Sequence, residues 1–253
     1  MKTKAHIQEA EYSFPYHYLV DFSNHSFSQH RIYSGGLFYA TYLIEILSML
    51  DKIRFKSIID VGCGDGFLCK KIKESFSSAD VWGVDYSSQA IRLAELMNRD
   101  NHINFLQSDI LLQLPKETFD VAVSVQVLEH IPPDLLEGFI ESIATLINNN
   151  GYLLISVPTP VLPVKNISKH YQHFTLDKLT ELLKQGFEIY EYSYSVKRYT
   201  LTARIIKKIL SNRLFVLQNT RLCRLFFQIY LKNCRTADQS NGTILTILCK
   251  KVM

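Results

Sequence analysis

Short apolar runs alternate along the chain with stretches whose apolar residues recur every three or four positions. The short runs predict buried strands at 57–59, 81–85, 103–106, 119–125, 152–157, 187–194 and 243–249. The helical spacing predicts amphipathic helices at 37–51, 67–75, 88–99, 134–147 and 176–184. An alternation of strands and helices is typical of an α/β fold with a mainly parallel sheet.

The first strand runs into a turn that contains three glycines, Asp60-Val61-Gly62-Cys63-Gly64-Asp65-Gly66, and a helix follows this turn. Glycine adopts backbone angles that side chains forbid, and it lets a ligand approach the main chain. The helix that follows offers unpaired N–H groups at its start. The turn is therefore typical of a nucleotide-type binding site, although a tight turn without a ligand would have the same sequence.

Two acidic residues follow later strands. Asp85 ends the second strand, 19 residues beyond Gly66, where a carboxylate can accept hydrogen bonds from both hydroxyls of a ribose. Asp109 follows the third strand, where its carboxylate could accept an adenine amino proton. Helix capping for Asp85 and a turn role for Asp109 are the alternatives. Because all these motifs lie at carboxyl ends of strands, they predict a ligand site at that edge of the sheet.

The composition narrows the class of protein. The chain has 253 residues, of which 47% are hydrophobic and 21% are charged, so it can fill the core of one large domain. A net charge of +4 is too small to indicate nucleic-acid binding by itself. Five cysteines without metal-type spacing favour a reducing, cytoplasmic location. The polar N-terminus predicts no secretory signal, and no apolar run reaches the roughly 18 residues of a spanning helix.

The motifs between residues 55 and 157 resemble class I S-adenosylmethionine-dependent methyltransferases. The glycine turn is similar to the first motif of that family, and Asp85 is similar to its ribose-binding acid. Gln126-Val127-Leu128-Glu129-His130-Ile131 resembles the exit of the fourth strand in the small-molecule branch, methyltransferase type 11/12, which includes ubiquinone O-methyltransferases. The resemblance implies a Rossmann-like, seven-stranded, mainly parallel sheet with helices on both faces and a helical insertion before the last strand.

The same resemblance implies S-adenosyl-L-methionine as methyl donor and S-adenosyl-L-homocysteine as product. It implies a cofactor site made of Asp60, Gly62, Cys63, Gly64, Gly66, Asp85, Tyr86, Asp109, Ile110, Val125 and Gln126. An NAD-type oxidoreductase is the competing interpretation, but its fingerprint is G-x-G-x-x-G. This chain has G-x-G-x-G with Phe67 at the third glycine position, which favours the methyltransferase.

Three histidines are candidate catalytic residues, because a hydroxyl acceptor would need a general base. His130 follows the fourth strand, and His170 and His173 lie in a segment similar to the family's His-x-x-x-Phe-Thr sequence before a helix. A structural role is the alternative for each of them. Glu129 is expected to face the sheet or to cap neighbouring amides. No metal-ligand triad is visible in the sequence, so no metal site is expected.

Two segments flank the predicted domain of residues 37–253. Residues 1–36 are rich in aromatic residues and either pack on the domain or form a lid over the site, with Tyr16 and His17 as candidate substrate contacts. Residues 195–235 form a basic amphipathic insertion before the last strand. This insertion could pack over the substrate pocket, contact a membrane surface at the inner face, form a homodimer interface or bind an anionic substrate.

The predicted function is methyl transfer to an oxygen or nitrogen of a small molecule, a saccharide or a lipid-linked acceptor. A tRNA or protein methyltransferase is the first alternative, and a non-catalytic, cofactor-binding partner subunit is the second. Nucleic acid is not the expected partner, because Pro132-Pro133 comes too late after the fourth strand for an amino-methyltransferase motif.

Overall fold

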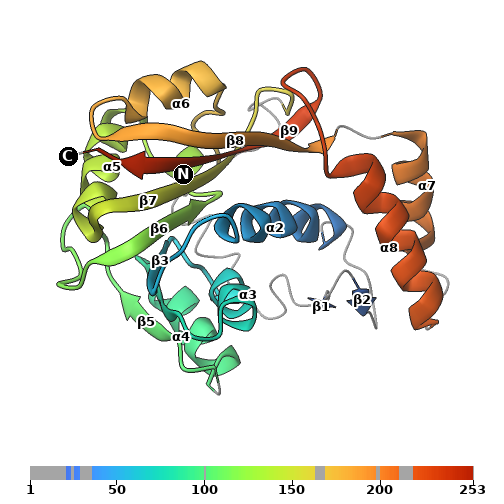
Figure 1. Ribbon diagram of the computed structural model, residues 1–253, viewed down its shortest axis with the longest axis horizontal. Coiled ribbons are helices and arrows are strands. Elements are labelled where there is room, and N and C mark those ends of the chain that lie inside the picture. Colours follow the sequence, from blue (N-terminus) through green and yellow to red (C-terminus); the bar gives the residue numbers. More distant parts are fainter. Residues whose placement is uncertain are drawn as a thin grey trace.

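A seven-stranded sheet forms the centre of the molecule (Figure 1). The computed structural model describes residues 21–23, 26–28, 36–99, 101–162, 169–197, 200–210 and 219–252. The strand order is β5-β4-β3-β6-β7-β9-β8. Their bounds are β3 Ser57–Val61, β4 Asp80–Asp85, β5 Asn104–Gln107, β6 Phe119–Val125, β7 Ile147–Pro158, β8 Phe187–Lys197 and β9 Gly242–Lys251.

The first five strands of this order run parallel, and β9 is antiparallel to both of its neighbours. The connecting helices are α3 Phe67–Ser75, α4 Ser88–Met97, α5 Leu136–Leu146 and α6 Leu176–Leu183. The chain moves outward from β3 to β5 and then returns to add β6 on the other side of β3. Such a reversal leaves a crevice at the carboxyl ends of the strands. The predicted Rossmann-like fold is confirmed.

Both faces of the sheet are covered because the strands are apolar on both sides. Ile58 packs into a core on one face, which includes helix α2 (Gly36–Leu50), α3 and part of the insertion. Its neighbour Ile59 packs into the core on the other face, together with α5 and α6. Successive side chains of a strand point to opposite faces, which explains this division. The helices thereby fix the strand ends that build the site.

The sequence prediction was wrong about residues 148–151, which were expected to end a helix before a strand beginning at Tyr152. In the structure β7 already begins at Ile147, which pairs with Phe119, and pairing resumes between Tyr152 and Val121. The intervening residues bulge out of the ladder. A Cβ atom on Gly151 would lie 2.6 Å from the Asp120 carbonyl oxygen, so glycine is required there by a close approach of two backbones.

The insertion before β9 contains two helices, α7 (Leu201–Leu210) and α8 (Thr220–Cys234), at the right of Figure 1. The end of α8 is tied to α2, because Arg235 Nε donates to Glu45 Oε2 at 2.8 Å. β8 continues to Lys197, so the predicted range 195–235 begins inside a strand.

Near the start of the chain, β1 (Asp21–Ser23) pairs antiparallel with β2 (Ser26–Ser28), and β2 lies against α8. These two strands were not predicted. The candidate lid residues Tyr16 and His17 lie outside the described residues. Within the ranges that the structure describes, no helix combines the length and the apolar character needed to cross a bilayer.

Candidate active site

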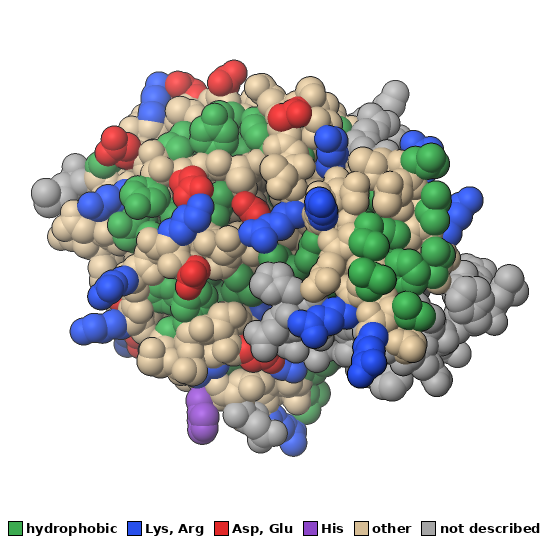
Figure 2. All heavy atoms as spheres, turned by 45° about the vertical axis from the view of Figure 1, so that its right-hand side comes forward, with side chains coloured by type: hydrophobic (Ala, Val, Ile, Leu, Met, Phe, Trp, Pro, Cys, Tyr) green, Lys and Arg blue, Asp and Glu red, His purple; other side chains and the backbone are tan. Residues whose placement is uncertain are grey.

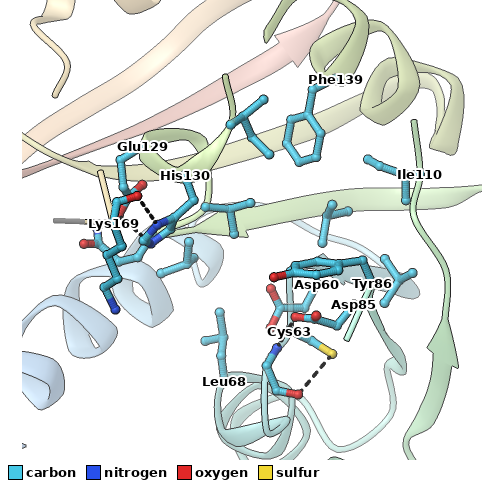
Figure 3. A pocket seen from close by; sticks show the side chains of 18 of the residues that line it. Asp60, Cys63, Leu68, Asp85, Tyr86, Ile110, Glu129, His130, Phe139 and Lys169 are labelled. Atoms are coloured by element: carbon cyan, nitrogen blue, oxygen red, sulfur yellow. Dashed lines mark hydrogen bonds and ion pairs between the residues drawn. The ribbon is translucent and has the colours of Figure 1, made fainter. Parts of the chain in front are cut away.

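A cavity of about 630 Å³ opens at the carboxyl ends of β3, β4 and β6 (Figure 3). Its walls come from the loops after β3 to β6, from the start of α2 and from residues 169–171. Ten of the predicted cofactor residues line it: Asp60, Gly62, Cys63, Gly64, Asp85, Tyr86, Asp109, Ile110, Val125 and Gln126. His130 and His170 line it too, whereas Gly66 and His173 are not among the lining residues.

The three glycines of the turn adopt positive φ angles, 81° at Gly62, 55° at Gly64 and 74° at Gly66. These angles are costly for residues with a side chain. A Cβ atom on Gly62 would lie only 2.4 Å from Val127 Cγ2, so Gly62 lets the loop after β3 pack against the loop after β6. Gly66 precedes α3, and its Cβ position is 2.6 Å from the Phe105 ring. Gly66 therefore has a packing role.

Asp85 holds the glycine turn in place. Its Oδ2 accepts the Gly64 N–H at 2.9 Å, and its Oδ1 accepts the Ser87 N–H at 2.9 Å. The Ser87 hydroxyl in turn caps α4 by accepting the Ala90 N–H. Each carboxylate oxygen can accept more than one hydrogen bond, so Asp85 can also bind hydroxyl groups in the cavity. Its position next to the cavity depends on both backbone contacts.

Carboxyl groups are concentrated around the glycine turn. Asp60 is buried, and burial raises its pKa to about 7, with a further contribution from the charges of Asp85 and Asp65. The Cys69 thiol opposes this shift by donating a hydrogen bond to Asp60 Oδ2 at 3.5 Å. Negative groups that repel one another are stabilised by a cation. This part of the cavity is therefore suited to a positively charged ligand.

The part of the cavity near Tyr86, Ile110 and Phe139 is more apolar than the acidic part at the glycine turn. Ile110 is buried, and Figure 3 shows its side chain together with Tyr86 and Phe139 around the cavity. Asp109 accepts the Leu111 N–H through Oδ1 at 3.0 Å, so it shapes the turn after β5 as well as lining the cavity. An apolar slot with a carboxylate at its edge suits a flat ring that carries an amino group.

The chain leaves β6 through a strained turn. Gln126 has a φ of 57°, which is uncommon for a residue with a side chain. Its backbone N–H and its side-chain amide both donate to the Ser156 carbonyl, at 2.8 and 3.2 Å. These hydrogen bonds stabilise the strained backbone conformation of Gln126. The 3-10 turn that follows, Leu128–His130, is thereby directed toward the cavity.

His130 is held in one orientation by the segment before α6. Its Nδ1 lies 3.3 Å from the Lys169 carbonyl oxygen, and its ring meets the His170 ring edge to face. A carbonyl oxygen can only accept, so in the neutral ring Nδ1 carries the proton and Nε2 carries a lone pair. This tautomer leaves His130 able to act as a base.

His170 and His173 form a second hydrogen-bonded pair, with His170 Nδ1 2.8 Å from His173 Nε2. His173 Nδ1 also contacts the Leu162 carbonyl, so Nε2 of a neutral His173 accepts and His170 Nδ1 donates. Burial lowers the pKa of His173, which favours this neutral form. His173 thus positions His170 and does not itself reach the cavity.

Glu129 was expected to face the sheet or cap amides, and the structure corrects this. Its side chain lines the cavity and is 1% exposed. Burial raises its pKa to about 8, although the Lys169 charge opposes the shift. Its Oε2 has no hydrogen-bond partner among the described residues. The signal in the sequence was a carboxylate four residues after a buried strand, at the sheet edge where ligands bind.

Glu129, His130 and His170 come together in space. One potential ligand atom from each lies within 4.8 Å of the others. Such a trio of imidazole and carboxylate groups could hold a divalent cation. Forty residues of sequence separate His130 from His170, so spacing along the chain gives no sign of the trio. The expectation that no metal binds stays a prediction.

A mainly parallel sheet with this strand order and a cavity at the reversal point defines a Rossmann-like domain. A family model described as a methyltransferase domain matches residues 38–192, which is more than half of the chain. The chain belongs to this family of methyltransferase domains, and the resemblance inferred from the sequence is confirmed.

Curated relatives match part of the chain. A ubiquinone biosynthesis O-methyltransferase of Cupriavidus pinatubonensis is 29% identical over 105 residues, covering 40% of this chain and 41% of that protein. The protein of the same name from Bradyrhizobium diazoefficiens is 24% identical over 170 residues, covering 64% and 60%. The chain thus spans less than two thirds of the length of these relatives.

Solved structures share the fold. The N-methyltransferase NodS of Bradyrhizobium japonicum, in complex with S-adenosyl-L-homocysteine, has a TM-score of 0.63 and 14% identity, with 100% of both chains covered. The magnesium protoporphyrin IX methyltransferase of Synechocystis, with bound S-adenosylmethionine, has a TM-score of 0.62 and 15% identity, covering 100% and 98%. At these identities the likeness concerns the fold.

Proposed function

We propose that this protein is an S-adenosylmethionine-dependent methyltransferase that acts on a hydroxyl group of a small, largely apolar acceptor. The observation that carries the proposal is a single cavity in which the acid-lined glycine turn faces the group formed by Glu129, His130 and His170. Membership of the methyltransferase family supports the reaction type, and the ubiquinone O-methyltransferases among its relatives support oxygen as the acceptor atom.

The cavity residues fit the cofactor in charge and in shape. S-adenosylmethionine is cationic at its sulfonium and amino groups, and the buried carboxyl groups of Asp60 and Asp85 favour cations. The Gly62 and Gly64 backbone can approach the ligand closely because neither residue has a Cβ. Asp85 would hold the ribose, and Ile110 with Asp109 would enclose the adenine. When bound, the cofactor supplies an electrophilic methyl group.

The other residues of the cavity would hold and activate the acceptor. Phe38, Tyr39 and Tyr171 line it with aromatic surface, which suits a flat or apolar molecule. His130 Nε2 would accept the hydroxyl proton, since its Nδ1 is engaged with the Lys169 carbonyl. Protonated Glu129 would donate a hydrogen bond that orients the acceptor oxygen. Exclusion of water and alignment would supply much of the rate.

Transfer of a labelled methyl group from S-adenosylmethionine to a panel of phenolic and aliphatic alcohols tests this proposal. His130→Ala should lower kcat by about a hundredfold, the usual contribution of a general base, with the cofactor Kd unchanged. His102→Ala, at an exposed histidine outside the cavity, is the control. Full turnover by His130→Ala would remove His130 from the mechanism.

The trio of Glu129, His130 and His170 could bind a cation, which would make the reaction metal-assisted. Removal of metal ions with a chelator distinguishes this reaction from one in which His130 acts as the general base. We expect activity to be unaffected by EDTA if His130 acts as the base. Loss of activity in EDTA that returns with Mg²⁺ or Zn²⁺ would reassign the trio to metal binding. We also place the protein in the cytoplasm, and its five cysteines, which are all buried and form no disulfide, support a reducing compartment.

A further inference from the structure

Charge is distributed unevenly along the chain. Residues 198–237 contain nine of the 28 Lys and Arg residues and none of the 24 Asp and Glu residues. This segment has a formal charge of +9, and the rest of the chain, with 19 basic and 24 acidic residues, has a charge of −5. The overall charge of +4 therefore conceals a strongly basic segment. Such a segregation of charge indicates an anionic partner.

The buried side chains of α7 and α8 pack on the domain. Ala203 and Ile206 of α7 are buried, as are Cys223, Phe227 and Tyr230 of α8, and all five belong to the core on the α2 side of the sheet. The two helices pack against each other, and α8 also contacts α2 and β8. Packing on the domain thus explains the inward apolar stripe, and it leaves the outward one unexplained.

The outward stripe consists of large apolar side chains in water. Leu201 and Ile205 of α7 are 73% and 50% exposed, and Leu222 and Leu225 of α8 are 42% and 49% exposed. Each pair is three or four residues apart, so its members lie on the same side of their helix. Figure 2 shows hydrophobic side chains gathered on the part of the surface that belongs to α7 and α8. We call this surface the α7–α8 outer face.

Cations border this apolar stripe. Among the side chains of α7 and α8 that the structure describes, the exposed basic ones are Arg204, Lys208, Arg221, Arg224 and Lys232. Arg221 and Arg224 directly precede Leu222 and Leu225, so charge and apolar surface run side by side along α8. In Figure 2 blue side chains lie around the green ones, and no red side chain is drawn among the described residues of this face.

We propose that the α7–α8 outer face docks on a bilayer surface that contains anionic phospholipids. Leucine and isoleucine would enter the boundary between headgroups and acyl chains, while arginine and lysine would contact the phosphates. Each cation near such a surface strengthens partition by roughly fivefold. A second copy of this chain fits the face less well, because it would bring two segments of +9 together.

Docking would bring lipid close to the cavity. The helix α2 packs against α8 on one side and contributes Phe38 and Tyr39 to the cavity wall. One helix thus lies between α8 and the cavity. An acceptor dissolved in the membrane would then be held near the protein, although docking itself does not depend on methyl transfer.

Co-sedimentation of the full chain with lipid vesicles tests the proposal without measuring activity. Vesicles of phosphatidylcholine with phosphatidylglycerol should bind the protein at least roughly tenfold better than phosphatidylcholine alone, and high salt should weaken this binding. The double variant Arg221→Glu with Arg224→Glu should lose the preference for phosphatidylglycerol. Leu222→Ser with Leu225→Ser should weaken binding to both vesicle types by at least roughly tenfold.

Matched changes elsewhere on the surface are the controls. Arg92→Glu with Arg99→Glu, and Leu96→Ser with Leu112→Ser, alter exposed residues of α4 and of the loops after α4 and β5, and these variants should bind as the wild type does. Circular dichroism and cofactor binding establish that every variant is folded. Equal binding to both vesicle types would overturn the proposal, as would equal losses in the controls. A dimer that Leu222→Ser with Leu225→Ser dissociates, or RNA binding in place of vesicle binding, would also overturn it.

Discussion

Asp60 and Glu129 are both buried carboxyl groups in one cavity, and their surroundings give them different chemistry. Asp60 lies near two other acids, Asp85 and Asp65, so a bound cation would stabilise its ionised form. Glu129 lies beside histidines and Lys169, and burial keeps it protonated up to a pKa of about 8. Two carboxyl groups can thus serve as a cation site and as a hydrogen-bond donor.

Titration of Asp60 should make cofactor affinity depend on pH. Its pKa is raised to about 7, so below that pH a proton competes with the cationic ligand. We expect the Kd for S-adenosylmethionine to rise toward tenfold for each pH unit below about 7. Asp60→Asn should bind weakly at every pH, and the exposed Asp134→Asn should follow the wild type. A wild-type Kd that is constant from pH 5 to 8 would contradict this assignment.

The raised pKa of Asp60 makes the stability of the fold depend on pH in the opposite direction to cofactor affinity. The folded state binds the Asp60 proton more tightly than the unfolded chain does, because the pKa rises from 3.8 to about 7 on folding. Its contribution to the free energy of unfolding therefore falls as the pH rises through this window. Cofactor binding at neutral pH would offset that loss by stabilising the ionised carboxylate.

Glu129 should limit activity on the alkaline side. If its protonated form orients the acceptor, kcat should decrease as the pH rises through about 8. Glu129→Gln keeps a donor of similar shape and should abolish this decrease while retaining activity. The measurement is kcat against pH for both proteins with saturating cofactor. An alkaline limb that is the same in Glu129→Gln would show that another group titrates there.

At the scale of elements, the residues packed against the turn after β3 constrain its backbone conformation. Gly62→Ala should lower the free energy of unfolding by about 2 kcal/mol, because it combines a positive φ with a Cβ 2.4 Å from Val127. Val127→Ala should restore part of the loss in the double variant. Urea unfolding measures all three proteins.

Gly138→Ala is the matched control for this prediction. Gly138 lies in the first turns of α5, and its Cβ would be 3.9 Å from the nearest atom, so alanine should be neutral or stabilise by up to about 1 kcal/mol. Equal effects of the two substitutions would mean that the contact between the loops after β3 and β6 does not constrain Gly62.

Periodicity predicted the elements well where local pattern and tertiary packing agree. The strands around Ile58 and Ala122 are apolar on both sides, and they became the centre of the sheet. The prediction failed at Asn148–Gly151, because a turn-like composition can also form a bulge within a strand. β8 and β9 were placed in the sequence, but no local signal gave their order in the sheet, in which β9 lies between β7 and β8.

At the scale of the whole molecule, the site is assembled from distant parts of the chain. The loop residues Gly62, Asp85 and Asp109 were predictable because each follows a strand, and parallel strands end at one edge of the sheet. The approach of His170 to His130 was not predictable, because it depends on how Lys169 and His170 pack against the turn after β6. The strained Gln126 and the buried Glu129 likewise follow from packing around the cavity.

The central claim is that this cavity binds S-adenosylmethionine through the glycine turn and Asp85. Calorimetric titration with S-adenosylmethionine and S-adenosylhomocysteine, with NAD as control ligand, tests it most directly. We predict micromolar binding of the first two ligands, no binding of NAD, and a loss of at least roughly tenfold in Asp85→Ala but not in Asp134→Ala. Binding of NAD, or an unchanged affinity in Asp85→Ala, would contradict the claim.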